Sequence, residues 1–294
     1  MSRALSVSGA PSTSAERARG RRRLVRGAIV GATVGYVAIL LLLPLIGIVW
    51  TALEPGFGIV GETLSRPEVR HAFFLTGIIT VISVIVTSFF GLIVSWVLVR
   101  QRFVGRSLLN ALVDLPFALS PVTVGLACVL LFGLNGWFAD WFAARGIQVI
   151  FAVPSMVLVT IFICVPFTIR EVVPVLEEIG LDEEDASRTL GASLWQTFFR
   201  VTLPNIRWAL AYGIALTTAR AIGEIGAVLI VSGLITGKTE TATIYIFTAI
   251  EERQTAEAYV VALVLALVSV ALLVVIEGLR RRTRHGRVEE GETV

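Results

Sequence analysis

The apolar residues of this chain gather in long blocks separated by short charged stretches. A helix of about 20 apolar residues crosses the hydrocarbon core of a bilayer, and blocks of at least about that length recur here. Only 16% of the 294 residues are charged, compared with about 25% in soluble domains. The pattern therefore predicts an all-α polytopic membrane protein. It excludes a soluble enzyme, a disordered chain and a secreted disulfide scaffold.

The number of blocks predicts six transmembrane helices. We expect them at about 27–52, 72–99, 108–133, 149–170, 208–234 and 258–279. Residues 1–26 are expected to form a disordered basic tail, and residues 280–294 a second tail. The first block is longer than the 7–15 apolar residues of a secretory signal, so it is interpreted as a true span.

The basic residues predict how these spans are oriented. With the N-terminus in the cytoplasm, 19 of the 25 Lys and Arg residues fall in cytoplasmic segments, five fall outside, and Arg220 lies within a span. Cytoplasmic segments of membrane proteins carry an excess of Lys and Arg. We therefore expect a cell-membrane protein whose two termini are both cytoplasmic.

The third block contains Pro116 and Pro121, which disfavour a straight helix because proline lacks a backbone N–H. Broken backbone at membrane depth is tolerated where protein or a water-filled cavity satisfies the freed groups. Two interpretations stay open: a kink, or a break that lines a translocation path with Pro116, Ser120 and Pro121. Pro154 and Pro166 are expected to mark the two ends of the fourth block.

The fifth block combines small and polar residues. Small residues recur every four positions, which lets membrane helices approach closely: Ala215, Ala219, Gly223 and Ala227. Thr217, Arg220 and Glu224 form a polar stripe at helical spacing. An arginine at the centre of a span costs roughly 2.5–3.5 kcal/mol, so Arg220 should face protein or water and pair with Glu224. Asp114 is a candidate third member. The pair is either a structural lock or a pore-facing group near a gate.

Residues 171–207 form a long hydrophilic segment with helical patterning. Four consecutive acidic residues, 182–185, suit a helix N-terminus and its dipole. Apolar residues then recur every four positions: Ala186, Leu190, Leu194 and Phe198. Gly191 has the place of a glycine that ends a helix.

A second short helix is predicted directly after this glycine. Ser193 and Gln196 have capping-box spacing, and Pro204 is expected to end the helix. The segment therefore predicts a helix, a glycine turn and a helix. Taken by itself, such a hairpin could also be an amphipathic element that lies on the membrane.

The hairpin resembles the EAA signature of ABC importer permeases, Glu-Ala-Ala-x3-Gly-x9-Ile-x-Leu-Pro. The matching positions are Asp185, Ala186, Ser187, Gly191, Val201, Leu203 and Pro204. The resemblance implies a type I permease core over about 72–279. It also implies that these residues, together with Leu194, couple the permease to an ATPase.

Three further runs resemble motifs of sulfate permeases: 115–121, 194–205 and 219–228. The run 194–205 is especially similar to the CysW-type sulfate/thiosulfate subunit. Ile225 departs from that pattern, where phenylalanine is usual. Molybdate permeases share the core of the third run. The resemblance implies import of sulfate and thiosulfate, with a molybdate or tungstate permease as the alternative. A secondary anion transporter is a second alternative.

The same resemblance implies several partners: a CysT-like second permease, an ATPase dimer and an extracytoplasmic sulfate-binding protein, but no nucleic acid. The residues agree that this chain binds no ATP by a phosphate loop, because Gly237-Lys238-Thr239 lacks the upstream glycine. We therefore expect no cofactor here, with ATP and Mg²⁺ on the ATPase. His71 and His285 are isolated, and the spans hold no catalytic set, so neither a metal site nor an enzyme is expected.

Overall fold

The computed structural model describes the backbone of residues 13–291 and the side chains of residues 25–278. These residues form helices and connecting loops, without a strand. The chain divides into two compact units, residues 1–51 and residues 52–294. The predicted all-α class is confirmed.

In its described residues the first unit is formed by α1 (Thr13–Leu53), whose apolar part from Val25 to Leu53 contains an 18-residue window with a mean hydropathy of 2.5. The expected disordered tail 1–26 is wrong for residues 13–26, which are helical. Alanine and arginine, which recur in this stretch, are good helix formers. Residues 1–12 lie outside the described part of the chain.

The second unit contains the other helices. Its long helices are α3 (Pro67–Arg100), α7 (Val153–Ile179), α10 (Leu203–Ile222) and α13 (Thr255–Gly291). Its shorter elements are α2 (Gly58–Ser65), α4 (Arg106–Ala118), α5 (Pro121–Phe132), α6 (Ala139–Ala143), α8 (Asp182–Thr189), α9 (Leu194–Thr197), the π-helical η1 (Phe198–Thr202), α11 (Gly226–Ser232) and α12 (Ala242–Glu251).

Four helices of the described chain are long and apolar enough to cross a membrane by themselves: α1, α3, α7 and α13. Two bent helix pairs bring the number of candidate spans to six if each pair counts as one span. Their bends are 110° between α4 and α5, and 53° between α10 and α11. The third and fifth predicted blocks are therefore broken, whereas the other blocks in the second unit overlap the continuous helices α3, α7 and α13.

The fourth predicted block has one correct boundary. Pro154 lies in the first turn of α7, where proline is tolerated. Pro166 does not mark an end, because α7 continues past it and past Pro174 to Ile179. Membrane helices accept interior prolines when neighbouring helices satisfy the freed backbone groups. The first nine residues of the expected coupling segment 171–207 thus belong to a span.

The centre of the second unit is the packing of α3, α7 and α10. Thr168 of α7 sits between two glycines. A Cβ added to Gly91 of α3 would lie 3.0 Å from the Thr168 Cβ, and one added to Gly213 of α10 would lie 3.1 Å from the Thr168 Cα. Because glycine has no side chain, the three helices can approach this closely at Gly91 and Gly213. The close contact of α10 with α7 therefore occurs at Gly213, two residues before the start of the predicted Ala215–Ala227 series.

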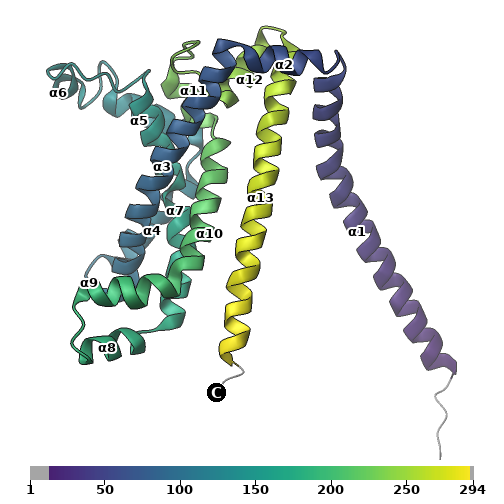
Figure 1. Ribbon diagram of the computed structural model, residues 1–294, viewed down its shortest axis with the longest axis vertical. Helices are drawn as coiled ribbons and strands as arrows, with labels where there is room; N and C mark the ends of the chain where they lie inside the picture. The colour runs from purple at the N-terminus through teal and green to yellow at the C-terminus, as the bar shows by residue number, and fades with distance from the viewer. Residues whose placement is uncertain (1–12, 292–294) are drawn as a thin grey trace, which may run out of the picture. The chain divides into compact units, whose positions relative to one another are not determined.

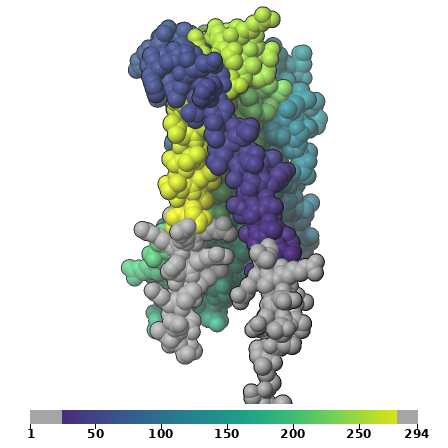
Figure 2. Space-filling model, turned by 90° about the vertical axis from the view of Figure 1, so that its right-hand side faces the viewer, coloured from purple at the N-terminus to yellow at the C-terminus, as the bar shows by residue number. Residues whose placement is uncertain are grey.

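The second unit has two distinct ends. The hairpin of α8 and α9 lies at one end, whereas α2 and α12 lie at the other (Figure 1). Helix α13 packs on α10 and α12, and the yellow upper part of α13 lies beneath the blue residues of α2 (Figure 2). This arrangement places the hairpin and the α2–α12 end at opposite ends of the long helices.

Candidate functional site

The first part of the candidate site is the α8–α9 hairpin, whose turn is built by a glycine and a capping box. Gly191 has φ +87°, a left-handed conformation that favours glycine. Ser193 accepts a hydrogen bond from the Gln196 N–H, and the Gln196 side chain accepts one from the Ser193 N–H. The hydroxyls of Ser187 and Thr197 lie 2.7 Å apart and join the two helices. The predicted helix, glycine turn and helix is therefore confirmed.

The hairpin is fastened to the membrane helices by a buried ion pair. Arg100, at the end of α3, places its Nη2 3.0 Å from Glu184 Oε1, and both side chains are almost fully buried. The Thr202 hydroxyl also donates to this oxygen at 3.0 Å, and Arg100 donates to the Leu176 carbonyl of α7. One carboxylate of α8 thus contacts η1 and the end of α3.

Sequence reasoning missed this role of Glu184. It assigned residues 182–185 together to the helix N-terminus, because their spacing does not distinguish one from another. The available signal was Arg100 at the end of a predicted span, which needs a partner if it is buried. In the structure, Glu184 is 3% exposed, whereas the other three acidic residues are exposed.

The outer surface of the hairpin is apolar and aromatic. Leu190 is 89% exposed and Leu194 is 66% exposed, and the exposed rings of Trp195 and Phe199 stack with their centroids 6.0 Å apart. Asp185, Ala186 and Gly191 are exposed as well. Exposed apolar patches of this kind mark surfaces that contact another protein or a membrane.

Two details of the predicted hairpin are wrong. Pro204 does not end the second helix, because α9, η1 and α10 are continuous from Leu194 to Ile222 and Pro204 lies in the first turn of α10. The four apolar residues from Ala186 to Phe198 do not form one stripe, because the turn at Gly191 separates them. Leu203, the first residue of α10, instead packs against Val172, Leu176 and Ile206 and holds this end of the hairpin against α7.

The second part of the candidate site is the break between α4 and α5. Helix α4 includes Pro116, which is buried, and ends at Ala118. After a two-residue link, Pro121 occupies the first turn of α5, with Ser120 as the preceding cap residue. The prediction of a break at these prolines is confirmed. Its size of 110° identifies a reversal of direction and not a mere kink.

The break between α10 and α11 contains the predicted Arg220–Glu224 pair. Arg220 Nη1 lies 2.7 Å from Glu224 Oε2, and the Arg220 side chain is 31% exposed whereas that of Glu224 is 2% exposed. Glu224 Oε1 accepts the Ala227 N–H at 2.9 Å, and the Glu224 carbonyl accepts the Thr243 hydroxyl. Glu224 therefore holds the backbone of the break as well as the arginine.

The two breaks pack directly against each other. A Cβ added to Gly226 would lie 2.9 Å from the Pro121 Cβ. One added to Gly125 would lie 2.9 Å from the Ala227 carbonyl oxygen. Two glycines thus let the starts of α5 and α11 approach within contact distance. The structure brings together the two irregular segments that the sequence had identified separately.

Two predicted members of the polar group lie elsewhere. Asp114 pairs with Arg170 of α7, with Oδ2 2.6 Å from Nη2, and not with Arg220. Thr217 is fully buried, and its hydroxyl lies 3.2 Å from that of Thr168. The predicted stripe over Thr217, Arg220 and Glu224 is interrupted because α10 ends at Ile222. In the part of the chain with described side chains, no cluster of three His, Cys, Asp or Glu residues could hold a metal ion.

Comparison with protein families gives a match over most of this unit. The family described as "Binding-protein-dependent transport system inner membrane component" matches residues 87–285. The chain belongs to this family.

Curated relatives of this permease cover nearly its whole length. The "Sulfate transport system permease protein CysW" of Synechocystis sp. is 47% identical, over 89% of this chain and 95% of that protein. The "Sulfate transport system permease protein CysT" of Escherichia coli (strain K12) is 38% identical, over 86% and 91% respectively. As in its family, the chain is a multi-pass inner-membrane protein.

A solved structure shares the fold of this permease. It is described as a bacterial alginate ABC transporter in complex with a pentasaccharide-bound periplasmic protein, and it aligns with a TM-score of 0.69. The alignment covers 90% of this chain and 96% of that one, at 17% sequence identity. The fold is thus that of an ABC importer permease.

Proposed function

We propose that this chain is the permease subunit of an ATP-driven ABC importer that moves sulfate, and thiosulfate with it, into the cytoplasm. The observation that carries the proposal is the α8–α9 hairpin, because it presents an exposed apolar surface and is tied by the buried Arg100–Glu184 pair to α3. Such a hairpin can transmit movement of a docked protein to the membrane helices. The choice of sulfate rests on the names of the relatives.

The coupling surface consists of residues that face outward on the hairpin. Ala186, Gly191 and Leu194 would dock in an ATPase subunit. Leu203 packs against α7, with Val201 in η1 and Pro204 in the first turn of α10 beside it. Asp185 and Ser187 complete the signature in α8. The chain itself would bind no cofactor and hydrolyse no ATP. ATP and Mg²⁺ would bind to a separate ATPase dimer.

The complex would contain two more partners. The relatives carry the distinct names CysW and CysT, which supports a heterodimeric permease with a CysT-like second subunit. An extracytoplasmic sulfate-binding protein would deliver the anion at the end formed by α2 and α12. In this arrangement the hairpin and both chain termini are cytoplasmic.

The translocation path would run between the two permease subunits beside the packed breaks. Sulfate carries two negative charges and is costly to place in an apolar pore. Arg220 is the partly exposed cation at the break, and Glu224 reduces its field. The pair would therefore give a weak site, which suits conduction because a tight site would retain the ion. Pro116, Ser120 and Pro121 would contribute backbone to this path.

The test is uptake of radioactive sulfate into proteoliposomes that contain the purified complex. Uptake should require ATP inside the vesicles and the binding protein outside, and excess unlabelled sulfate or thiosulfate should compete. Uptake driven by an ion gradient without ATP would instead identify a secondary transporter. Stronger competition by molybdate or tungstate than by sulfate would identify the other oxyanion permease.

A further inference from the structure

A polar pocket lies at the end of the second unit opposite the hairpin. Its volume is about 190 Å³, and it is formed by the junction of α2 and α3, the loop before α12, and the turn between α12 and α13. Three carboxylates line it, from Glu68, Glu240 and Glu252, with Arg66 as the basic residue among the lining groups. The pocket is therefore acidic, and neither the hairpin nor the helix breaks contribute to it.

Glu240 is the most buried of these carboxylates and lacks a full set of partners. The residue is 3% exposed, and its Oε1 accepts the Thr248 hydroxyl at 2.7 Å. Its Oε2 is buried and has no hydrogen-bond partner. A buried carboxylate oxygen without a partner is costly. This oxygen could therefore accept a hydrogen bond that the structure does not supply.

The backbone around Glu240 is held in place. The Thr239 hydroxyl donates to the Ser232 carbonyl at 2.6 Å, and Thr241 caps the start of α12. The N–H of Ala242 donates to the Thr76 hydroxyl of α3. These contacts position Glu240 before any ligand arrives, and preorganisation of this kind favours binding.

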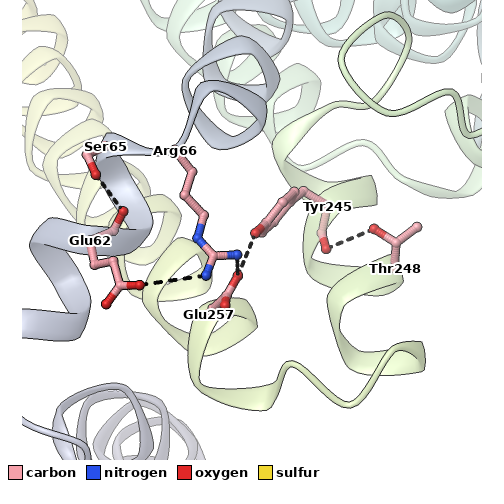
Figure 3. Close-up of polar contacts among 6 residues, drawn as sticks. All are labelled: Glu62, Ser65, Arg66, Tyr245, Thr248 and Glu257. Carbon is pink, nitrogen blue, oxygen red and sulfur yellow. Dashed lines mark hydrogen bonds and ion pairs between the residues drawn. The ribbon is translucent and has the colours of Figure 1, made fainter.

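Arg66 does not neutralise the pocket, because other carboxylates already hold it. Figure 3 shows its guanidinium between Glu257 Oε2, at 2.7 Å, and Glu62 Oε1, at 3.9 Å. The Tyr245 hydroxyl also donates to Glu257 at 3.0 Å. Burial, followed by this hydrogen bond, raises the pKa of Tyr245 from 10.0 to about 12, so the hydroxyl stays a donor at neutral pH. Arg66 therefore forms no ion pair with the pocket carboxylates of Glu68, Glu240 and Glu252.

The arrangement selects an extended cation over a metal ion. Among the residues with described side chains, no three His, Cys, Asp or Glu groups lie close enough to bind a metal. The pocket is also several times larger than the volume of about 30 Å³ that one water occupies in the liquid. A guanidinium or ammonium group on a long side chain can instead reach separated carboxylates with several donors.

We propose that this pocket receives a lysine or arginine side chain of the extracytoplasmic binding protein when that protein docks. The inference rests on the proposed function, which places α2 and α12 on the side from which the binding protein delivers sulfate. Glu240 would accept the cation at its carboxylate, and Glu68 and Glu252 would attract it at the rim. The pocket would thereby give the docking surface a negative charge that matches a basic side chain of the binding protein.

The test measures the affinity of the purified sulfate-binding protein for the complete permease–ATPase complex in lipid nanodiscs. Glu240→Gln keeps the size and the bond to Thr248 but removes the charge, and it should weaken binding about tenfold or more. Glu252→Gln is an exposed rim variant that should weaken binding less and leave folding intact. Glu251→Gln is the matched control, because it removes the same charge from an exposed residue of α12 outside the pocket.

A double-mutant cycle then identifies the ligand. One Lys→Ala or Arg→Ala variant of the binding protein should lose its effect when combined with Glu240→Gln, or with Glu252→Gln if the Glu240 variant does not assemble. Unchanged affinity of the glutamate variants would overturn the proposal. It would also be overturned if the losses of affinity from the glutamate variant and from each Lys or Arg variant of the binding protein were strictly additive. A wild-type complex that does not bind the sulfate-binding protein at all would instead contradict the proposed function.

Discussion

At the scale of single residues, the candidate site depends on a few groups whose backbone or burial allows little variation. Gly191 is in the left-handed region, Glu184 is a buried charge, and Glu224 joins an ion pair to a backbone contact. Each of these residues can be substituted separately. The effect of a substitution on sulfate uptake should differ from its effect on the stability of the protein.

Gly191→Val should abolish sulfate uptake while the protein still reaches the membrane. A β-branched residue at φ +87° is strained by about 1–3 kcal/mol and would reshape the docking turn. Uptake and the amount of protein in the membrane fraction are the measurements. Gly77→Val is the control, since Gly77 has no atom within 4 Å of an added Cβ. Normal uptake by the Gly191 variant would contradict the coupling assignment.

Glu184→Gln should lower both uptake and the melting temperature of the complex. Removing one partner of a buried ion pair leaves the other charge unpaired, at a cost of about 3–5 kcal/mol; here Arg100 would be left. Asp182→Asn removes the same charge from an exposed position at the start of α8 and should change neither quantity. Equal effects of the two variants would mean that the buried pair does not anchor the hairpin.

The Arg220–Glu224 pair can be tested by uptake with single and double variants. Arg220→Ala leaves the buried Glu224 carboxylate unpaired, so it should impair assembly more than the double variant Arg220→Ala/Glu224→Gln. A simple exchange of the two residues is a poor test, because arginine at 224 cannot accept the Ala227 N–H. If the double variant assembles but does not transport, the arginine acts in the path. Restored uptake would identify a structural pair.

At the scale of elements, the two helix breaks support each other. Helices α5 and α11 lie in contact because Gly125 and Gly226 have no side chains. The buried residues of both helices join those of α3 and α7 in one core. A movement of either break must therefore displace the other.

Gly125→Ala should lower the melting temperature of the purified protein. The added methyl group would lie 2.9 Å from the Ala227 carbonyl oxygen, and overpacking of this kind costs about 1–3 kcal/mol. Gly223→Ala is the matched control, because its nearest contact is at 3.7 Å. A melting temperature unchanged by the Gly125 substitution would show that the two breaks do not press together.

At the scale of the whole molecule, the second unit has a different chemistry at each end. One end presents the apolar hairpin, and the other presents an acidic pocket. The proposed function assigns these ends to opposite sides of the membrane, with the ATPase at the first and the binding protein at the second.

Cysteine labelling tests this assignment. A membrane-impermeant maleimide added to intact cells should label Lys238→Cys, in the loop before α12, but not Asp182→Cys, at the start of α8. Inverted vesicles should give the opposite result. Both positions are exposed, and the native Cys128 and Cys164 are buried and should stay unlabelled. Labelling of both positions from one side would contradict the predicted orientation.

Much of the fold was predictable because it depends on neighbouring residues. Long apolar runs predict membrane helices, prolines without N–H groups predict the break before α5, and Ser193 with Gln196 predicts a helix start. The wrong predictions, such as helix ends at Pro166 and Pro204, concern prolines that lie within continuous helices. Whether a proline ends a helix depends on how the surrounding structure satisfies the freed backbone groups, and the local sequence does not show this.

By itself, the sequence determined the class of protein, the approximate places of its apolar helices and the hairpin that resembles the EAA signature. Only the tertiary structure decided which charges meet: Arg100 with Glu184, Arg170 with Asp114, and Arg66 with Glu257. These partners are 84, 56 and 191 positions apart in the chain. Local spacing cannot determine such contacts, because they form only when separate helices pack and bury the charges together.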